Sequence, residues 1–255
     1  MRTLGLALAW LVLWGAVAPF AGSAQAGSSF ELLRLDKSVV KWGEPETGTG
    51  ARVSYAFVTE KMRFAGARNC QEMQSPDAFL ESSAIAAGDL ATEVDAAFAM
   101  WSAVSNIDFY RVNDPRQAQI LIGAQTADRG TAFANVRYQI AGADAVTGGQ
   151  GDVRTIQQSL VCLNPSRAWK VGFKGDPKAY DLRYTLAHEI GHAIGLDHPG
   201  ATGQLMAFTY QEQFRDLQNG DVEGAVALYG KRTVPAVAAR EDKTDLALTP
   251  LAQRR

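Results

Sequence analysis

Histidine and cysteine are the scarcest chemically reactive residues of this 255-residue chain, with 3 and 2 copies. So few cysteines exclude a disulfide-dense mini-protein, and the lack of a glycine-proline repeat excludes a collagen-like chain. Charge of one sign is not in excess either, with 25 Lys+Arg against 27 Asp+Glu, so the basic face of a general nucleic-acid binder is not expected. A hydrophobic content of 47% predicts a globular protein whose core is large enough for folding without several disulfides or a structural metal.

Long hydrophobic runs are absent after the first 26 residues. Arg2 supplies a positive start, residues 4–20 are apolar without a charge, and Ala24-Gln25-Ala26 has the small-residue pattern of a cleavage site. This arrangement predicts a secretory signal peptide, cut after Ala26. A membrane-anchoring helix is the alternative, but the apolar run is at the short end of the roughly 17–25 residues that a span requires. We expect an exported protein, extracellular or periplasmic, with no membrane span in the mature chain.

Export would place both cysteines in an oxidising compartment. Cys70 and Cys162 are then an even pair, which favours one disulfide. Closing a loop of roughly 90 residues would stabilise the fold by about 4–5 kcal/mol in the chain-entropy account. Two buried free thiols are the alternative, and the sequence alone leaves both open.

Apolar periodicity predicts strands and helices in mixed order. Steps of three and four from Leu90 to Val104 predict a helix whose apolar stripe includes Trp101. Alternating or short apolar runs predict strands at 51–58, 107–112, 118–123 and 156–163, with an edge strand at 133–138. Further helices are expected from Leu182, with Asp181 as N-cap, and over residues 221–229 before Gly230.

All three histidines fall in one short window, residues 188–198, with the sequence His-Glu-Ile-Gly-His-Ala-Ile-Gly-Leu-Asp-His. On a helix, His188 and His192 are four residues apart and project from one face, so both imidazoles can bind one metal ion. Gly195 permits a sharp turn that brings His198 back as the third ligand. Three imidazoles leave one coordination position open, which is typical of a catalytic rather than a structural zinc site.

Glu189 follows the first of these histidines and is the candidate catalytic base. Its carboxylate can reach a water on the metal without being a ligand itself. A bare His-Glu-x-x-His also arises by chance, in which case the histidines are ordinary core or surface groups. The 3 histidines of this chain all lie in the one window, with glycine at the bend, which argues against chance.

The extended pattern His-Glu-x-x-His-x-x-Gly-x-x-His resembles the metzincin clan of zinc endopeptidases. Residues 185–210 are similar to the active-site helix and Met-turn of the matrixins, the matrix-metalloproteinase-like family within that clan. The resemblance implies that Met206 is the Met-turn residue and that residues 217–230 contain the family's C-terminal helix. It covers residues 51–230, most sharply in their last third.

Together, the pattern and the resemblance predict an α+β, zincin-like fold. We expect a twisted mixed β-sheet with two packed helices, one of them the active-site helix. A small C-terminal subdomain would then carry the Met-turn and the final helix, across a cleft. The expected divisions are a signal peptide at 1–26, a lead segment at 27–50, a catalytic domain at 51–230 and a flexible C-terminal tail at 231–255.

The chain departs from the matrixin pattern in its metal-binding residues. Matrixins commonly hold a second, structural zinc with histidines before the active-site helix, and no histidine remains here for that purpose. One catalytic Zn²⁺ and no structural zinc are therefore expected. Asp128, Asp144 and Asp152 are oxygen donors that calcium could use, but a solvated loop is the favoured interpretation.

Other departures concern the substrate pocket and the cysteine motif that masks the zinc in the family. The wall segment of the pocket usually reads Pro-x-Tyr in matrixins, whereas this chain has Phe208-Thr209-Tyr210. Tyr210 remains a candidate for lining the pocket. No Pro-Arg-Cys-Gly switch precedes the domain, and Cys70 is interpreted as structural. The lead segment is too short for the family's helical prodomain.

The predicted activity is hydrolysis of peptide bonds in a protein or peptide substrate by a monomer. Zinc on His188, His192 and His198 would activate a water, and Glu189 would take its proton and pass it to the leaving amine. An extended substrate would pair with the edge strand at 133–138. A non-catalytic zinc-binding module and a zinc hydrolase acting on another bond are the alternatives from other classes.

Overall fold

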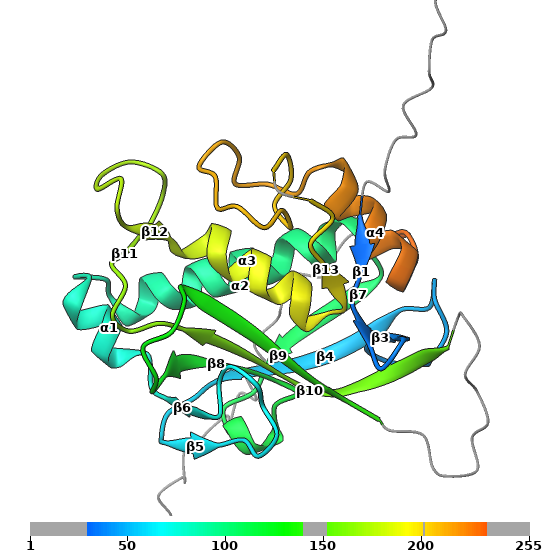
Figure 1. The fold of residues 1–255 in the computed structure, drawn as a ribbon, viewed down its shortest axis with the longest axis horizontal. Helices are drawn as coiled ribbons and strands as arrows, with labels where there is room; N and C mark the ends of the chain where they lie inside the picture. Colours follow the sequence, from blue (N-terminus) through cyan, green and yellow to red (C-terminus); the bar gives the residue numbers. More distant parts are fainter. Residues whose placement is uncertain (1–29, 140–151, 201, 234–255) are drawn as a thin grey trace, which may run out of the picture.

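The computed structural model of the protein describes residues 30–139, 152–200 and 202–233. The predicted signal peptide, Asp144 and residues 234–255 of the predicted tail lie outside the described residues. Two long helices lie over one face of a twisted sheet, and the last helix lies beside the end of this helical layer (Figure 1). Among the described residues, no helix combines the length and the apolar character that crossing a membrane requires.

The central sheet has the strand order β7-β4-β8-β10-β9. The four strands other than β9 are parallel to one another, whereas β9 runs antiparallel to β10. Among the described strands, β9 pairs with β10 alone, so its other side is a sheet edge. The predicted strands are thus confirmed, with the bounds β4 (Ala51–Phe57), β7 (Ile107–Arg111), β8 (Ile120–Gln125), β9 (Ala132–Tyr138) and β10 (Val153–Leu163).

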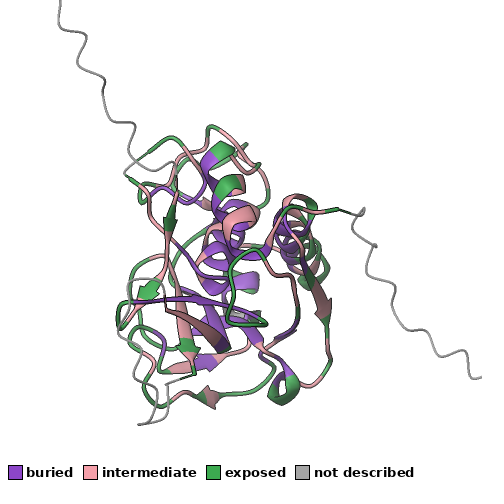
Figure 2. Cartoon of the chain, turned by 90° about the vertical axis from the view of Figure 1, so that its right-hand side faces the viewer, coloured by how far each residue is buried: buried purple, intermediate pink, exposed green. Residues whose placement is uncertain are grey.

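Both faces of the sheet are covered, which is why every residue of β8 is buried. Ile120 and Ile122 pack in the larger core cluster, with the helices, while Leu121 packs in a second cluster with Cys162 and Met73. The second cluster includes the hairpin formed by β5 (Met62–Arg63) and β6 (Glu72–Gln74), which pairs with the end of β8. Buried residues accordingly gather in the middle of the molecule, on both strands and helices (Figure 2).

Both long helices predicted from the sequence are present, and α2 has the predicted apolar stripe. Helix α2 (Ala87–Val104) buries Leu90, Val94, Ala97, Phe98 and Trp101. Helix α3 (Leu182–Ala193) begins after Asp181, whose side chain accepts a hydrogen bond from the Tyr184 amide as an N-cap. The Trp101 indole donates to the Ala187 carbonyl at 3.0 Å, which fixes α2 against α3. The shorter helical elements are α1 (Asp77–Ser82) and the 3₁₀ turn η1 (Pro115–Gln117).

Helix α4 (Asn219–Tyr229) begins two residues earlier than predicted. The reason is a capping box, in which Gln218 and Asp221 exchange hydrogen bonds between side chain and backbone. The helix ends before Gly230, which has a φ of 76°. That conformation suits glycine, as the sequence predicted.

The lead segment forms three short strands that the sequence did not predict. Strand β1 (Glu31–Leu32) pairs with β13 (Leu196–Asp197), and β2 (Arg34–Leu35) pairs with β3 (Ser38–Lys41). Strand β3 also pairs in parallel with the first residues of β10. A further two-stranded pair, β11 (Trp169–Lys170) with β12 (Tyr180–Asp181), precedes helix α3.

Cys70 and Cys162 form a disulfide, with their Cα atoms 6.4 Å apart. The pairing favoured from the sequence is confirmed, and the alternative of two free thiols is wrong. The bond fastens the loop between β5 and β6 to β10. Asn135 of β9 adds to this attachment, because its Oδ1 accepts hydrogen bonds from the amides of Arg68 and Asn69.

Candidate active site

The structure brings the three predicted imidazoles together. His188 and His192 project from α3, and His198 follows β13 after the bend at Gly195. The Nε2 atom of His198 lies 3.1 Å from the Nε2 atoms of both His188 and His192. Two nitrogens bound to one tetrahedral zinc at about 2.0–2.1 Å are roughly 3.3 Å apart. The spacing of these donor atoms therefore fits one zinc ion.

Backbone carbonyls orient two of the three rings. The Nδ1 atom of His188 donates to the Leu205 carbonyl at 2.7 Å, and Nδ1 of His192 donates to the Leu196 carbonyl at 2.8 Å. Since a carbonyl can only accept, each Nδ1 carries the proton and each Nε2 presents a lone pair. Both rings are thus in the tautomer that binds a metal through Nε2.

The environment also keeps these rings neutral. Burial, and next the neighbouring imidazoles, lower the pKa of His188 to about 3 and that of His192 to about 4. Burial lowers the pKa of His198 as well, against the opposing charge of Asp197. Neutral imidazole is the form that ligates a metal, so the chemistry of the donor set agrees with its geometry. Among the described residues, these histidines are the one group of three or more side chains placed to hold a metal ion.

Glu189 is 7% exposed and lines the same cleft as the imidazoles. Burial raises the pKa of its carboxyl to about 8, and a hydrogen bond from the Ala134 backbone of β9 opposes this rise. A divalent cation close by favours the ionised carboxylate. The structure therefore places a buried carboxyl group in the cleft that the imidazoles also line.

The bend before His198 depends on glycine for two reasons. Gly195 has a φ of 106°, in the region that residues with a Cβ rarely adopt. In addition, a Cβ at this position would lie 2.1 Å from the carbonyl oxygen of Val40. The predicted bend is therefore present, and a strand of the lead segment lies directly against it.

Met206 lies beneath the site, as the sequence resemblance implied. It is 2% exposed, and a Cβ added to Gly191 would meet its sulfur at 2.2 Å. The amides of Leu205 and Met206 donate to the two carboxylate oxygens of Asp221, each at 2.9 Å. Sequence reasoning missed this role of Asp221. An acidic residue in the first turn of a predicted helix was a signal for a cap, but nothing in the sequence linked it to Met206.

The imidazoles and Glu189 open into a cleft of about 1080 Å³. Strand β9 lines it, together with the loop after β5, part of the lead segment and the segment after Met206. Phe208 lies on its rim, 75% exposed, with its ring 5.3 Å from the His198 ring. Tyr210 also lines the cleft, so this candidate from the sequence is confirmed even though the Pro-x-Tyr pattern is not kept.

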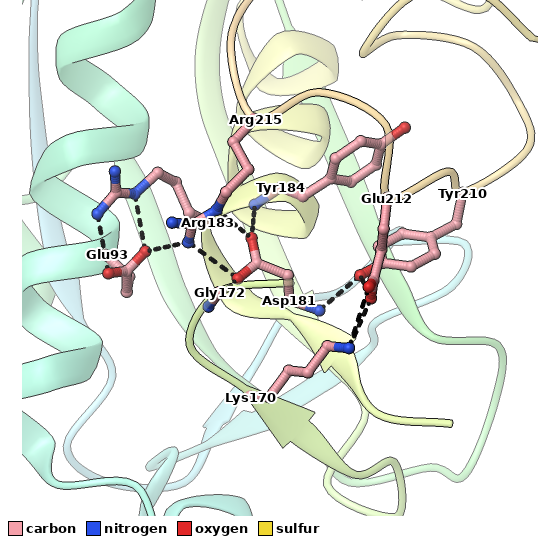
Figure 3. Close-up of polar contacts among 9 residues, drawn as sticks. All are labelled: Glu93, Lys170, Gly172, Asp181, Arg183, Tyr184, Tyr210, Glu212 and Arg215. Carbon is pink, nitrogen blue, oxygen red and sulfur yellow. Dashed lines mark hydrogen bonds and ion pairs between the residues drawn. The ribbon is translucent and has the colours of Figure 1, made fainter. Parts of the chain in front are cut away.

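Tyr210 is fixed by a polar network that Figure 3 shows. Its hydroxyl accepts a hydrogen bond from the Asp181 amide at 2.7 Å and donates one to Glu212 at 2.8 Å. Glu212 also pairs with Lys170, again at 2.8 Å. These contacts hold the wall of the cleft against the start of α3.

The network continues to helix α2. Arg215 pairs with the buried carboxylates of Asp181 at 2.9 Å and Glu93 at 3.0 Å, and Arg183 binds Glu93 with two hydrogen bonds. The segment between Met206 and α4 is therefore anchored to both long helices.

The two described aspartates considered for calcium are engaged elsewhere. Asp128 accepts a hydrogen bond from the side-chain amide of Asn164, and Asp152 pairs with Arg154. Neither belongs to the group of three or more metal-binding side chains found among the described residues.

A His-Glu-x-x-His helix, a third imidazole beyond a glycine bend and a methionine turn underneath define a metzincin-type centre. Comparison with known proteins gives the family within this class: the matrixin family model matches residues 78–230. This chain belongs to the matrixin family, whose members are zinc-dependent endopeptidases with a catalytic zinc. The resemblance, the metzincin fold class and the zinc cofactor predicted from the sequence are thereby confirmed.

Individual relatives agree with this assignment. The chain is 41% identical over 75 residues to matrix metalloproteinase-19 of Mus musculus, covering 29% of this chain and 14% of that protein. It is 29% identical over 147 residues to metalloendoproteinase 1-MMP of Arabidopsis thaliana, covering 56% of this chain and 38% of that protein. It is 32% identical over 146 residues to human matrix metalloproteinase-20, covering 55% of this chain and 28% of that protein. The chain thus spans less than half the length of these curated relatives.

Proposed function

We propose that this protein is an exported zinc endopeptidase that cleaves peptide bonds in extended protein or peptide substrates. The observation that carries the proposal is the convergence of three neutral imidazoles beside buried Glu189, in a cleft bordered by a sheet edge. The matrixin membership of residues 78–230 supports the same reaction class.

In the proposed mechanism, His188, His192 and His198 hold the zinc through their Nε2 atoms. When bound, zinc supplies Lewis-acid chemistry, which polarises a carbonyl group and lowers the pKa of water. Glu189 accepts a proton from the attacking water at a carboxylate oxygen and later donates it to the nitrogen of the leaving amine. The hydrogen bond from the Ala134 backbone lowers the pKa of this carboxyl and so favours the form that accepts a proton.

Strand β9 is the proposed binding edge for the substrate backbone. Its outward side is unpaired among the described strands, and all of its residues line the cleft. An extended peptide can add to such an edge through main-chain hydrogen bonds, which bring little side-chain preference. Selectivity would then come from the opposite wall, where Phe208 and Tyr210 face the cleft.

We also propose that the chain is exported, that residues 51–230 form the catalytic domain, and that it acts as a monomer without nucleic acid. The apolar start and small-residue site at 1–26 support export, and the Cys70–Cys162 disulfide suits an oxidising compartment.

Replacement of the proposed base tests the mechanism. Glu189→Gln removes the proton acceptor but no zinc ligand, so we expect zinc binding to persist while cleavage of a fluorogenic peptide falls by at least about 100-fold. Zinc is measured by elemental analysis, and wild type treated with phenanthroline provides the metal-depleted reference. Glu81→Gln, at an exposed position on α1, is the matched control and should retain wild-type activity.

The same assay separates the alternatives. A wild-type protein that binds zinc but cleaves neither casein nor generic peptides would be a binding module or a hydrolase of another bond. A Glu189→Gln variant that keeps most of its peptidase activity would show that another group is the base.

A further inference from the structure

Strand β13 supports two of the three imidazoles. The carbonyl of Leu196 accepts the Nδ1 hydrogen bond that orients His192. Asp197 directly precedes His198, and its carboxylate accepts a hydrogen bond from the His198 amide at 2.8 Å. The position of β13 therefore sets the ring orientation of His192 and the place of His198 in the site.

The strand partner of β13 comes from the lead segment. Glu31 pairs with Asp197 and Leu32 pairs with Leu196, and among the described strands β13 pairs with β1 alone. One residue further on, the Leu33 amide donates to the Gly195 carbonyl at 2.8 Å. The pairing thus continues through the glycine bend itself.

The end of α3 is also bound by the lead segment. The last carbonyls of a helix have no partner within the helix and must find one elsewhere. Here the Trp42 indole donates to the Ala193 carbonyl at 3.0 Å, a carbonyl shared with the Ser159 hydroxyl. The Tyr229 hydroxyl accepts from the Trp42 amide at 3.0 Å and donates to the Ile194 carbonyl at 2.6 Å.

Successive carbonyls at 193, 194 and 195 are therefore held by the lead segment, either directly or through Tyr229. The carbonyl of Val40 additionally fills the space beside Gly195. Apart from Tyr229, the residues that make these contacts belong to 31–42, which precede the region matched by the family model, residues 78–230.

We propose that residues 31–42 are a positioning element of the metal centre, holding β13 and the end of α3 so that His192 and His198 converge with His188. Trp42 is the residue on which this role can be tested. It is a positioning residue, since it acts on the ligands through Ala193 and, via Tyr229, through Ile194. The inference rests on the proposed metal site, and it is independent of which bond the enzyme cleaves.

The test compares two indoles that make the same hydrogen bond in different places. Trp42→Phe removes the bond to Ala193, whereas Trp169→Phe removes a bond of 3.0 Å from an equally buried indole to the Asn164 carbonyl, away from the ligand turn. Tyr229→Phe is a second, smaller change that breaks the link between Trp42 and Ile194. Each variant is prepared as the full mature chain.

The first readout is zinc affinity, measured by competition with a chromophoric chelator. Partners that orient metal ligands typically contribute 10–100-fold to affinity. We expect about a three- to ten-fold weaker affinity for Trp42→Phe, because the Ala193 carbonyl keeps its bond from Ser159. We expect a similar loss for Tyr229→Phe, because Ile194 is not a ligand and only its neighbours in the turn are held less firmly. Trp169→Phe should bind zinc as wild type does.

The visible spectrum of the cobalt-loaded protein is the second readout, since it reports ligand geometry. We expect changed bands in Trp42→Phe and Tyr229→Phe only, with KM unchanged. A purely structural role would lower stability in all three variants and alter neither readout selectively.

Wild-type affinity and an unaltered cobalt spectrum in a folded Trp42→Phe or Tyr229→Phe protein would overturn the inference. If one of these variants does not fold, the other decides. A wild-type protein that binds zinc and cleaves no peptide would refute the proposed function. The zinc affinities of the variants would still show whether the lead segment positions the ligands.

Discussion

His188, His192 and His198 are the same side chain, and their differences come from the backbone atoms around them. Two rings donate Nδ1–H to carbonyls of residues 205 and 196, which are outside the helix that carries the rings. A functional imidazole here is therefore a product of contacts made by the whole local fold.

At the residue scale, the candidate ligands and the candidate base could be proposed from the sequence because their spacing follows helix geometry directly. Residues four apart on a helix share a face whatever surrounds them. Asp221 and Phe208 could not be identified this way. Asp221 acts by accepting hydrogen bonds from the amides of residues 205 and 206, which are distant in sequence. The exposure of Phe208 depends on the path of an irregular segment.

Phe208 gives a prediction at this scale. Its ring is exposed at the cleft rim beside His198, so we expect it to contact apolar side chains of the substrate. Phe208→Ala should raise KM by about three- to ten-fold with little change in kcat, corresponding to about 1 kcal/mol of lost apolar contact. Steady-state kinetics on a peptide with large apolar side chains provides the measurement.

Val171→Ala is the control for this experiment, because Val171 is the other exposed large hydrophobic residue among those described and is not among the residues lining the cleft. Its kinetics should match wild type. An equal rise in KM for both variants would mean that Phe208 has no specific contact with substrate.

At the element scale, long helices and strands were predicted well and very short strands were missed. Helix α3 carries its own start signal in Asp181, and α2 shows its apolar stripe over 18 residues. By contrast, β1 and β13 have 2 residues each and show no periodicity. They are strands only because they meet each other, which requires the completed fold.

Arg215 gives a prediction for the connection between elements. It lies between the buried carboxylates of Asp181 and Glu93 and so joins the cleft wall to α3 and α2. Arg215→Met should lower the free energy of unfolding by about 2–4 kcal/mol, because it removes a cation from two buried anions. Urea unfolding followed by tryptophan fluorescence provides the measurement.

The matched control is Arg116→Met, which breaks an ion pair with Glu60 in which both side chains are exposed. That change should cost less than about 1 kcal/mol. Similar costs for the two variants would show that the Arg215 network does not stabilise the fold.

At the scale of the whole molecule, the α+β class and the edge strand were predictable, but the covering of both sheet faces was not. The sequence shows alternation in β4, yet four consecutive residues, 53–56, are buried there. The second layer is a short hairpin fastened by the Cys70–Cys162 disulfide, and no local pattern indicates where such a hairpin packs.

The disulfide gives the prediction at this scale. It closes a loop between residues separated by 92 positions and joins the hairpin layer to the centre of the sheet. Replacing both Cys70 and Cys162 by Ala should lower the free energy of unfolding by about 4–5 kcal/mol, since the unfolded chain regains the freedom of that loop. Urea unfolding of the variant and of wild type reduced with dithiothreitol should give the same loss, and an unchanged midpoint in both would contradict it.

Strand β1 pairs with β13, the strand that directly precedes His198. This pairing has a practical consequence for purification. A polyhistidine tag placed just ahead of Phe30 would bring foreign imidazoles close to the native ones, where they could compete for the ion or capture it from a nickel resin. Assays of metal content are therefore best made on protein tagged after Arg255, with the tag removed.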